Sequence, residues 1–175
     1  LRLAILVHLE LKLRPIRIPL LLSVFAILAA CSAADPGPPQ ISIEQTWARA
    51  TPEGAATAAV YAVIHNAGGA DRLLSVETPA SASTEVHRTE HENGMAQMRA
   101  VESLDIPARG QVVLQPSGLH LMLNGLHAQL VDGQRIPLGF VFEEAGRIDV
   151  EAQVVPIDAL EAPGDAGADH SAHQH

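Results

Sequence analysis

The sequence predicts an all-β domain, a Greek-key sandwich or barrel of seven to nine strands, over residues 41–157. Short runs rich in Val, Ile and Leu recur along this stretch, and turn residues separate them at fairly regular intervals. Asn-Gly and Asp-Gly pairs, which tolerate the positive φ of tight hairpins, stand between several of these runs. No stretch after residue 31 sustains the apolar period of a long helix, so we expect helices to be few and short.

Each expected strand is a short apolar run bounded by turn residues. Aromatic residues make up only 3% of the chain, so aliphatic side chains must fill the core. The expected strands are Ile41–Ala48, Ala58–Asn66, Arg72–Glu77, Thr84–Glu90, Ala96–Glu102, Gln111–Leu114, Leu119–Leu123, Ile136–Phe142 and Ile148–Val155. The turns expected between them are Asn66–Gly69, Asn93–Gly94, Ala108–Gly110, Asn124–Gly125, Asp132–Gly133 and Ala145–Gly146.

Residues 1–30 have the pattern of a secretory signal peptide. Arg2, Lys12, Arg14 and Arg17 precede the apolar run 20–28, which is shorter than the roughly 20 residues of a membrane span. The run ends in Leu-Ala-Ala-Cys31, which resembles the bacterial lipobox, whose Cys is lipidated and becomes the mature N-terminus. We therefore predict a lipoprotein signal peptide over residues 1–30, a lipid on Cys31, and a location in the periplasm or cell envelope. The alternative is a soluble exported protein with an incidental Cys.

The segments on either side of the domain are expected to be a tether and a tail. Residues 31–40 form a short tether rich in Pro and Gly. Residues 158–175 form a disordered tail with a metal-binding composition. Its histidines could hold a metal ion such as Cu(II), which accepts imidazole readily, and a solvated extension is an equal alternative; they are His170, His173 and His175.

The acidic balance of the chain excludes some partners. Residues 31–175 carry 7 Lys and Arg against 19 Asp and Glu, a formal charge of −12 with His neutral. Such a surface repels nucleic acid and anionic lipid headgroups, so neither is an expected partner. Membrane association is therefore expected to come from the lipid on Cys31.

All three methionines lie between residues 87 and 122, near three histidines. By default a Met fills a core and a His is a surface residue. However, His120 and Met122 are two residues apart on one expected strand and leave the same face. Met98 follows the Asn93–Gly94 turn on the strand that returns from His87, so these residues could converge from three strands. By residue chemistry alone, Met95, His91 and His127 are also candidate metal ligands.

Imidazole and thioether together favour Cu(I) over harder ions such as Zn²⁺, Mg²⁺ or Ca²⁺. A blue-copper electron carrier needs a Cys thiolate, and the single cysteine, Cys31, is assigned to the lipid anchor. No Ser/His/Asp or paired-carboxylate arrangement stands out at recognisable spacing, so we do not expect an enzyme. The alternative in a different class is a β-sandwich interaction or adhesion lipoprotein whose His and Met are only structural.

The spacing of four of these residues resembles that of the bacterial periplasmic copper chaperones of the PCu(A)C type. Their pattern is His, ten residues, Met, twenty-one residues, His, one residue, Met, and it fits His87, Met98, His120 and Met122. The flanking segments are similar too: 46–52, Tyr61 with His65-Asn66, 71–73, and 118–126. The resemblance covers nearly all of residues 41–156.

The resemblance implies a cupredoxin-like Greek-key β-barrel without catalytic activity, which holds Cu(I) near one exposed end. It also implies delivery of Cu(I) to the Cu(A) subunit of cytochrome c oxidase or to a thiol-bearing assembly protein. Two features depart from the family pattern. Arg88 and Thr89 stand where many relatives have a Met, and Met95 is displaced by one residue from their Met-x-Met. We therefore expect Met95 to be a core or rim residue facing away from Met98, and His91 and His127 to be solvated loop residues.

Overall fold

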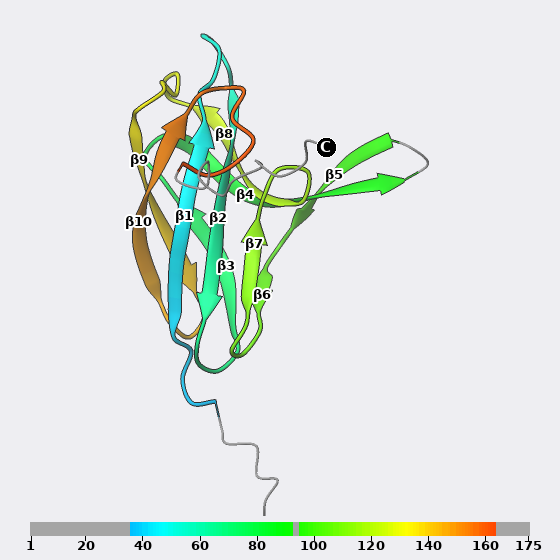
Figure 1. Cartoon of the computed structure of the whole chain (residues 1–175), viewed down its shortest axis with the longest axis vertical. Coiled ribbons are helices and arrows are strands. Elements are labelled where there is room, and N and C mark those ends of the chain that lie inside the picture. Colours follow the sequence, from blue (N-terminus) through cyan, green and yellow to red (C-terminus); the bar gives the residue numbers. More distant parts are fainter. Residues whose placement is uncertain (1–35, 93–94, 164–175) are drawn as a thin grey trace, which may run out of the picture. The chain divides into compact units, whose positions relative to one another are not determined.

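The computed structural model describes residues 36–163 except 93 and 94, and leaves out the side chains of residues 91 and 92. The signal peptide, Cys31 and the tail histidines predicted above lie outside these residues. No helix occurs in the described part, so none there could cross a membrane. The strands are β1 (Ile41–Arg49), β2 (Thr57–Asn66), β3 (Asp71–Glu77), β4 (Ser81–Glu92), β5 (Met95–Val101), β6 (Leu104–Ile106), β7 (Gln111–Leu114), β8 (Leu119–Leu126), β9 (Arg135–Phe142) and β10 (Arg147–Val155) (Figure 1).

The strands form one mixed sheet in the order β5-β4-β8-β2-β1-β10-β9-β3-β6, with β7 added beside β2. The pairing of β1 with β10 is parallel, and the other pairings are antiparallel. Strands distant in sequence lie side by side, since β4 pairs with β8 and β3 pairs with β9. The hydrogen-bonded order is an open path within the described residues, so the sheet is not closed into a barrel.

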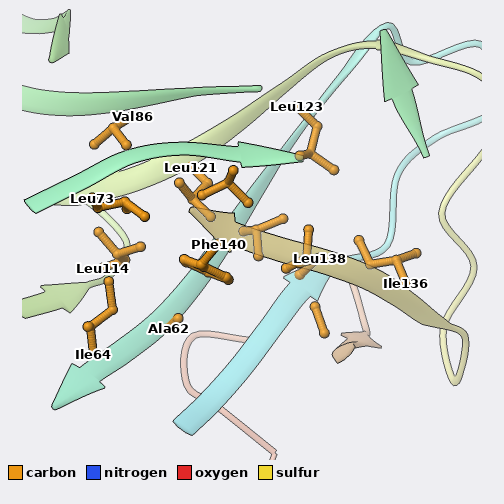
Figure 2. Packing of buried hydrophobic residues seen from close by; sticks show 14 of the residues in the cluster. Ala62, Ile64, Leu73, Val86, Leu114, Leu121, Leu123, Ile136, Leu138 and Phe140 are labelled. Atoms are coloured by element: carbon orange, nitrogen blue, oxygen red, sulfur yellow. The ribbon is translucent and has the colours of Figure 1, made fainter. Parts of the chain in front are cut away.

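The core lies between two parts of the folded sheet, where β4 and β8 face β9 and β3. Figure 2 shows Leu73 of β3 and Phe140 of β9 packed with Val86 of β4 and Leu121 of β8. Phe140 and Leu121 are fully buried. Thr84 of β4 donates its hydroxyl hydrogen bond to the carbonyl of Val76 in β3, which ties the two halves together beside the core. The core therefore fixes which face of β4 and of β8 turns inward.

The all-β class and the absence of long helices agree with the sequence predictions, but two details were wrong. The described chain has ten strands rather than seven to nine, because β6 was missed. That strand has three residues, too few for an alternating pattern to show. The Asn124–Gly125 pair lies inside β8 rather than in a hairpin turn: Gly125 takes a φ of 66° while β8 continues to Leu126, which pairs with Ser81.

A smaller apolar cluster lies on the outer face of β1 and β2. Trp47 and Tyr61 pack with ring centroids 4.5 Å apart, next to Val155. Burial raises the pKa of the Tyr61 phenol, and the nearby Arg49 guanidinium acts in the opposite direction. Ala159 joins this cluster and accepts a hydrogen bond from Arg49 Nε at 2.8 Å, so the chain after β10 is held against this face.

We predict that replacing Phe140 with Ala lowers the free energy of unfolding by about 3–5 kcal/mol, because it opens a cavity in the centre of the core. Chemical denaturation followed by circular dichroism measures this. Leu74→Ala on the exposed face of β3 is the matched control, with an expected change within about 0.5 kcal/mol. Similar losses for both variants would contradict this assignment of the core.

Candidate metal site

The four predicted ligands project from one face of three neighbouring strands. In β4 and β8, Val86 and Leu121 point into the core, so the residues beside them point to the outer face. His87 pairs directly with His120 across β4 and β8, and directly paired residues project to the same side. Met122 lies two residues beyond His120, on the same face of β8.

The β4–β5 hairpin adds the fourth side chain to this face. Met98 pairs with Thr89, and Ala100 pairs with His87, in a register that runs without a shift. Because Thr89 and His87 are two residues apart, Met98 projects to the same side as His87. Since β8 lies alongside β4, the three strands present these four side chains on one face of the sheet.

The imidazoles of His87 and His120 are in edge-to-face contact. Their ring centroids are 5.9 Å apart and their planes meet at 82°. His120 is buried at 5% exposure, and the side chain of His87 is 17% exposed. Two imidazoles packed this closely and largely withheld from water form the less accessible part of the site.

Each imidazole has one nitrogen anchored by a hydrogen bond. Nδ1 of His120 lies 3.1 Å from the carbonyl oxygen of Gly118, which can only accept, so Nδ1 carries the proton and Nε2 carries the lone pair. Nε2 of His87 lies 3.0 Å from Oε2 of Glu85, and a carboxylate also accepts. Nδ1 of His87 is buried and has no hydrogen-bond partner within the described structure.

These contacts leave one nitrogen of each imidazole able to bind a metal ion. A buried nitrogen without a partner is costly, and a bound metal would satisfy it. Anchoring the second nitrogen of a ligating His is how proteins orient such ligands. The thioethers differ in accessibility, since Met98 is 60% exposed and Met122 is partly buried. No group of three His, Cys, Asp or Glu suited to a metal occurs in the described part of the chain.

The remaining candidates lie elsewhere. Met95 pairs with Glu92 and is three residues from Met98, so it faces the opposite side of the hairpin as expected; it is exposed rather than part of the core. His91 was expected in a loop but lies within β4, paired with Ala96. His127 follows β8, is exposed, and bonds through Nδ1 to the carbonyl of Pro79 at 3.0 Å.

Sequence reasoning missed Glu85. Its carboxylate contacts His87 and also accepts a hydrogen bond from Nδ2 of Asn124 at 3.3 Å. The signal that could have found it is spacing, because residues 85 and 87 are two apart on one strand and share a face. In addition, Glu85 pairs with Met122 across the strands and so lies among the candidate ligands.

Comparison with known proteins agrees with the fold and with the resemblance seen in the sequence. The family described as "Putative lipoprotein LpqE-like" matches residues 41–154. The chain belongs to this family. A relative from Leifsonia xyli subsp. xyli, "Putative lipoprotein Lxx21020", is 31% identical over 132 residues, which cover 74% of this chain and 79% of the relative.

Solved PCuAC domains share the fold of this family member. The structure titled "apo PmoF2 PCuAC domain" has a TM-score of 0.61 and 28% identity, and covers 72% of this chain and 98% of its own. "Copper-bound PCuAC domain from PmoF2" has a TM-score of 0.58 and 26% identity, with coverage of 69% and 96%. The "Solution structure of CuI-DR1885 from Deinococcus Radiodurans" has a TM-score of 0.53 and 30% identity, with coverage of 73% and 85%. The predicted cupredoxin-like class is confirmed, although the sheet stays open.

We predict that hydrogen peroxide oxidises Met98 to the sulfoxide faster than Met122 in the metal-free protein, because the Met98 side chain is the more exposed. Peptide mass spectrometry over time measures both rates. Met95, which is equally exposed on the opposite face of the hairpin, serves as the internal reference for Met98. Equal rates for Met98 and Met122 would contradict the difference in accessibility.

Proposed function

We propose that this protein is an extracytoplasmic copper carrier that binds Cu(I) through His87, Met98, His120 and Met122. The observation that carries the proposal is the His87–His120 pair, whose rings are in contact while each keeps one nitrogen for a ligand. Two thioethers project from the same face of the sheet. Two solved relatives, which are copper-bound or Cu(I)-bound by their titles, support the choice of metal.

The two thioethers and two imidazoles suit a Cu(I) ion that the protein carries and then passes on. Two thioethers and two imidazoles hold Cu(I) without a thiolate, which would bind it more tightly and would oxidise outside the cytoplasm. Met98 lies on the exposed hairpin, and His120 is buried beside the core. Release therefore starts by exchange of Met98 for an incoming thiolate and ends at His120.

The proposed acceptor is a site richer in thiolates than this one. The Cu(A) subunit of cytochrome c oxidase and a thiol-bearing assembly protein both meet this condition, and both follow from the PCuAC resemblance. Transfer to either is downhill, because thiolate binds Cu(I) more strongly than thioether. Each exchange step replaces one ligand at a time, so free copper is not released. The protein acts here as a carrier and not as an enzyme.

The proposed location is the cell envelope, and more specifically the periplasm, with a lipid on Cys31 as the anchor. The lipobox-like sequence before Cys31 supports this, as do the names of the family and of the Leifsonia relative, which both describe lipoproteins. The first strand begins at Ile41, so few residues separate the lipid from the domain.

We predict that replacing Met98 and Met122 together with Leu abolishes high-affinity Cu(I) binding, because the thioether donors are lost while side-chain volume is nearly kept. Anaerobic titration against a chromogenic Cu(I) chelator measures the affinity, and thermal unfolding checks the fold. Met95→Leu is the matched control, since this Met lies on the opposite face of the same hairpin. Unchanged affinity in the double variant would favour the alternative, a β-sandwich interaction or adhesion lipoprotein without a functional metal site.

A second ion, Cu(II), is proposed for His170, His173 and His175. Ala59, Ala159 and Ala162 all pack against the cluster of Trp47, Tyr61 and Val155. Ala59 also pairs with Met122, so the described chain ends beside the outer face that carries the candidate Cu(I) ligands. The 12 residues that follow Pro163 span at most about 40 Å when extended. Cu(II) accepts imidazole ligands readily, so three closely spaced histidines suit capture of the oxidised ion.

We predict that replacing all three tail histidines with Ala removes one Cu(II) equivalent and leaves Cu(I) affinity unchanged. Equilibrium dialysis with Cu(II) measures the stoichiometry, and the chelator titration measures Cu(I). His127→Ala is the matched control, because this exposed His is bonded to Pro79 and lies apart from the candidate ligands. Unaltered Cu(II) stoichiometry in the triple variant would show that the tail is a solvated extension.

A further inference from the structure

Glu85 lies inside the group of candidate ligands but is not one of them. It pairs with Met122 across β4 and β8, next to the pair formed by His87 and His120. One of its oxygens, Oε2, is 3.0 Å from Nε2 of His87 and 3.3 Å from Nδ2 of Asn124. Asn124 lies on the same face of β8, two residues beyond Met122. The carboxylate of Glu85 is thus held between the amide of Asn124 and the imidazole of His87.

The contact decides which nitrogen of His87 can bind a metal. An ionised carboxylate has no proton to give, so a hydrogen bond to it requires the proton on Nε2. In a neutral imidazole the lone pair is then on Nδ1, which is the buried nitrogen without a partner in the described structure. Asn124 donates to the same oxygen and so restrains the carboxylate in the position that makes this contact.

We propose that Glu85, restrained by Asn124, is a positioning residue that keeps the proton of His87 on Nε2 and presents Nδ1 to Cu(I). This inference rests on the proposed copper-binding function and deepens it. His120 is arranged in the same way, since the carbonyl of Gly118 holds Nδ1 and leaves Nε2. In both strands the anchor is the residue two positions before the His. The side chain of Glu85 holds Nε2 of His87 and the backbone carbonyl of Gly118 holds Nδ1 of His120, so the two imidazoles present opposite nitrogens.

Two other roles for Glu85 fit the structure less well. A contribution to folding stability is expected to be small, because the Glu85 side chain is 52% exposed and exposed ion pairs add little. Direct binding of copper is disfavoured, because carboxylate is a hard donor and Cu(I) is soft. Furthermore, Oε2 already accepts two hydrogen bonds that binding would disturb. The remaining role for Glu85 is control of which nitrogen of His87 carries the proton.

Glu85→Gln tests the proposal. The Gln amide can donate to Nε2, so it allows the proton to move to Nδ1. We expect long-range ¹H–¹⁵N NMR of the metal-free variant to show a larger fraction of His87 protonated on Nδ1. We also expect Cu(I) affinity to fall by about 10- to 100-fold, the range typical of residues that orient metal ligands. Asn124→Ala should produce smaller changes in the same direction, since it removes only the restraint on the carboxylate.

Glu90→Gln is the matched control. Glu90 lies on the opposite face of β4 and forms an ion pair with Arg99, with 3.0 Å between Oε2 and Nε. The His87 tautomer and the Cu(I) affinity should therefore both stay at their wild-type values. An unchanged His87 tautomer in Glu85→Gln would overturn the proposal, as would a shifted tautomer with wild-type affinity. Weaker Cu(I) binding by Glu85→Gln with an unchanged His87 tautomer would favour direct ligation by the carboxylate instead.

The NMR measurement uses the metal-free protein, so it separates this inference from the proposed function. If the wild-type chain binds no Cu(I), the proposed function fails whatever the tautomer of His87. If it binds Cu(I) and the tautomer does not respond to residue 85, only the positioning role fails.

Discussion

The antiparallel register between β4 and β8 places His87 directly opposite His120, and the candidate site depends on this pairing. In a strand, successive side chains alternate between the two faces, so a slip of one residue would move every side chain to the other face. Val86 and Leu121 resist such a slip because both are packed in the core. The apolar core is therefore what holds two imidazoles in contact on the outer face, and the same register brings Glu85 beside Met122.

The site combines a rigid part and an exposed part. His120 is tied through Nδ1 to Gly118, whose carbonyl also accepts the backbone amide of Thr89 at 3.1 Å. By contrast, the side chains described on β5 are almost all exposed, and the outer part of the β4–β5 hairpin projects away from the other strands (Figure 1). A carrier needs both properties, because it must define the ligand geometry and still let an acceptor reach the metal.

Two polar residues, Asn66 and Asp71, lie in segments that resemble the copper chaperones but are not candidate ligands, and both have structural roles. Asn66 is buried, and its side chain bonds to Gln40, Gly68, Gly69 and Pro107 around the turn after β2. Asp71 accepts backbone hydrogen bonds from Arg72, Glu144 and Ala145, which joins β3 to the β9–β10 turn. These contacts satisfy buried polar groups at the ends of strands. They maintain the sheet that carries the candidate ligands, and they explain why polar residues occur inside an apolar pattern.

The sequence by itself determined the all-β class, nine of the ten strands, and the shared face of His120 and Met122. Alternation along a strand is a local property, and for this reason His120 with Met122, and Met95 against Met98, could be assigned without coordinates. Only the tertiary structure decided that β4 lies between β5 and β8, that β6 forms, and that Asn124 and Gly125 continue β8. The hydrogen bonds of Glu85 also required it, because Asn124 is 39 residues away in sequence and nothing local indicates which strands become neighbours. Pairing between distant strands is set by burial of the whole core, and no short segment of the sequence carries that information.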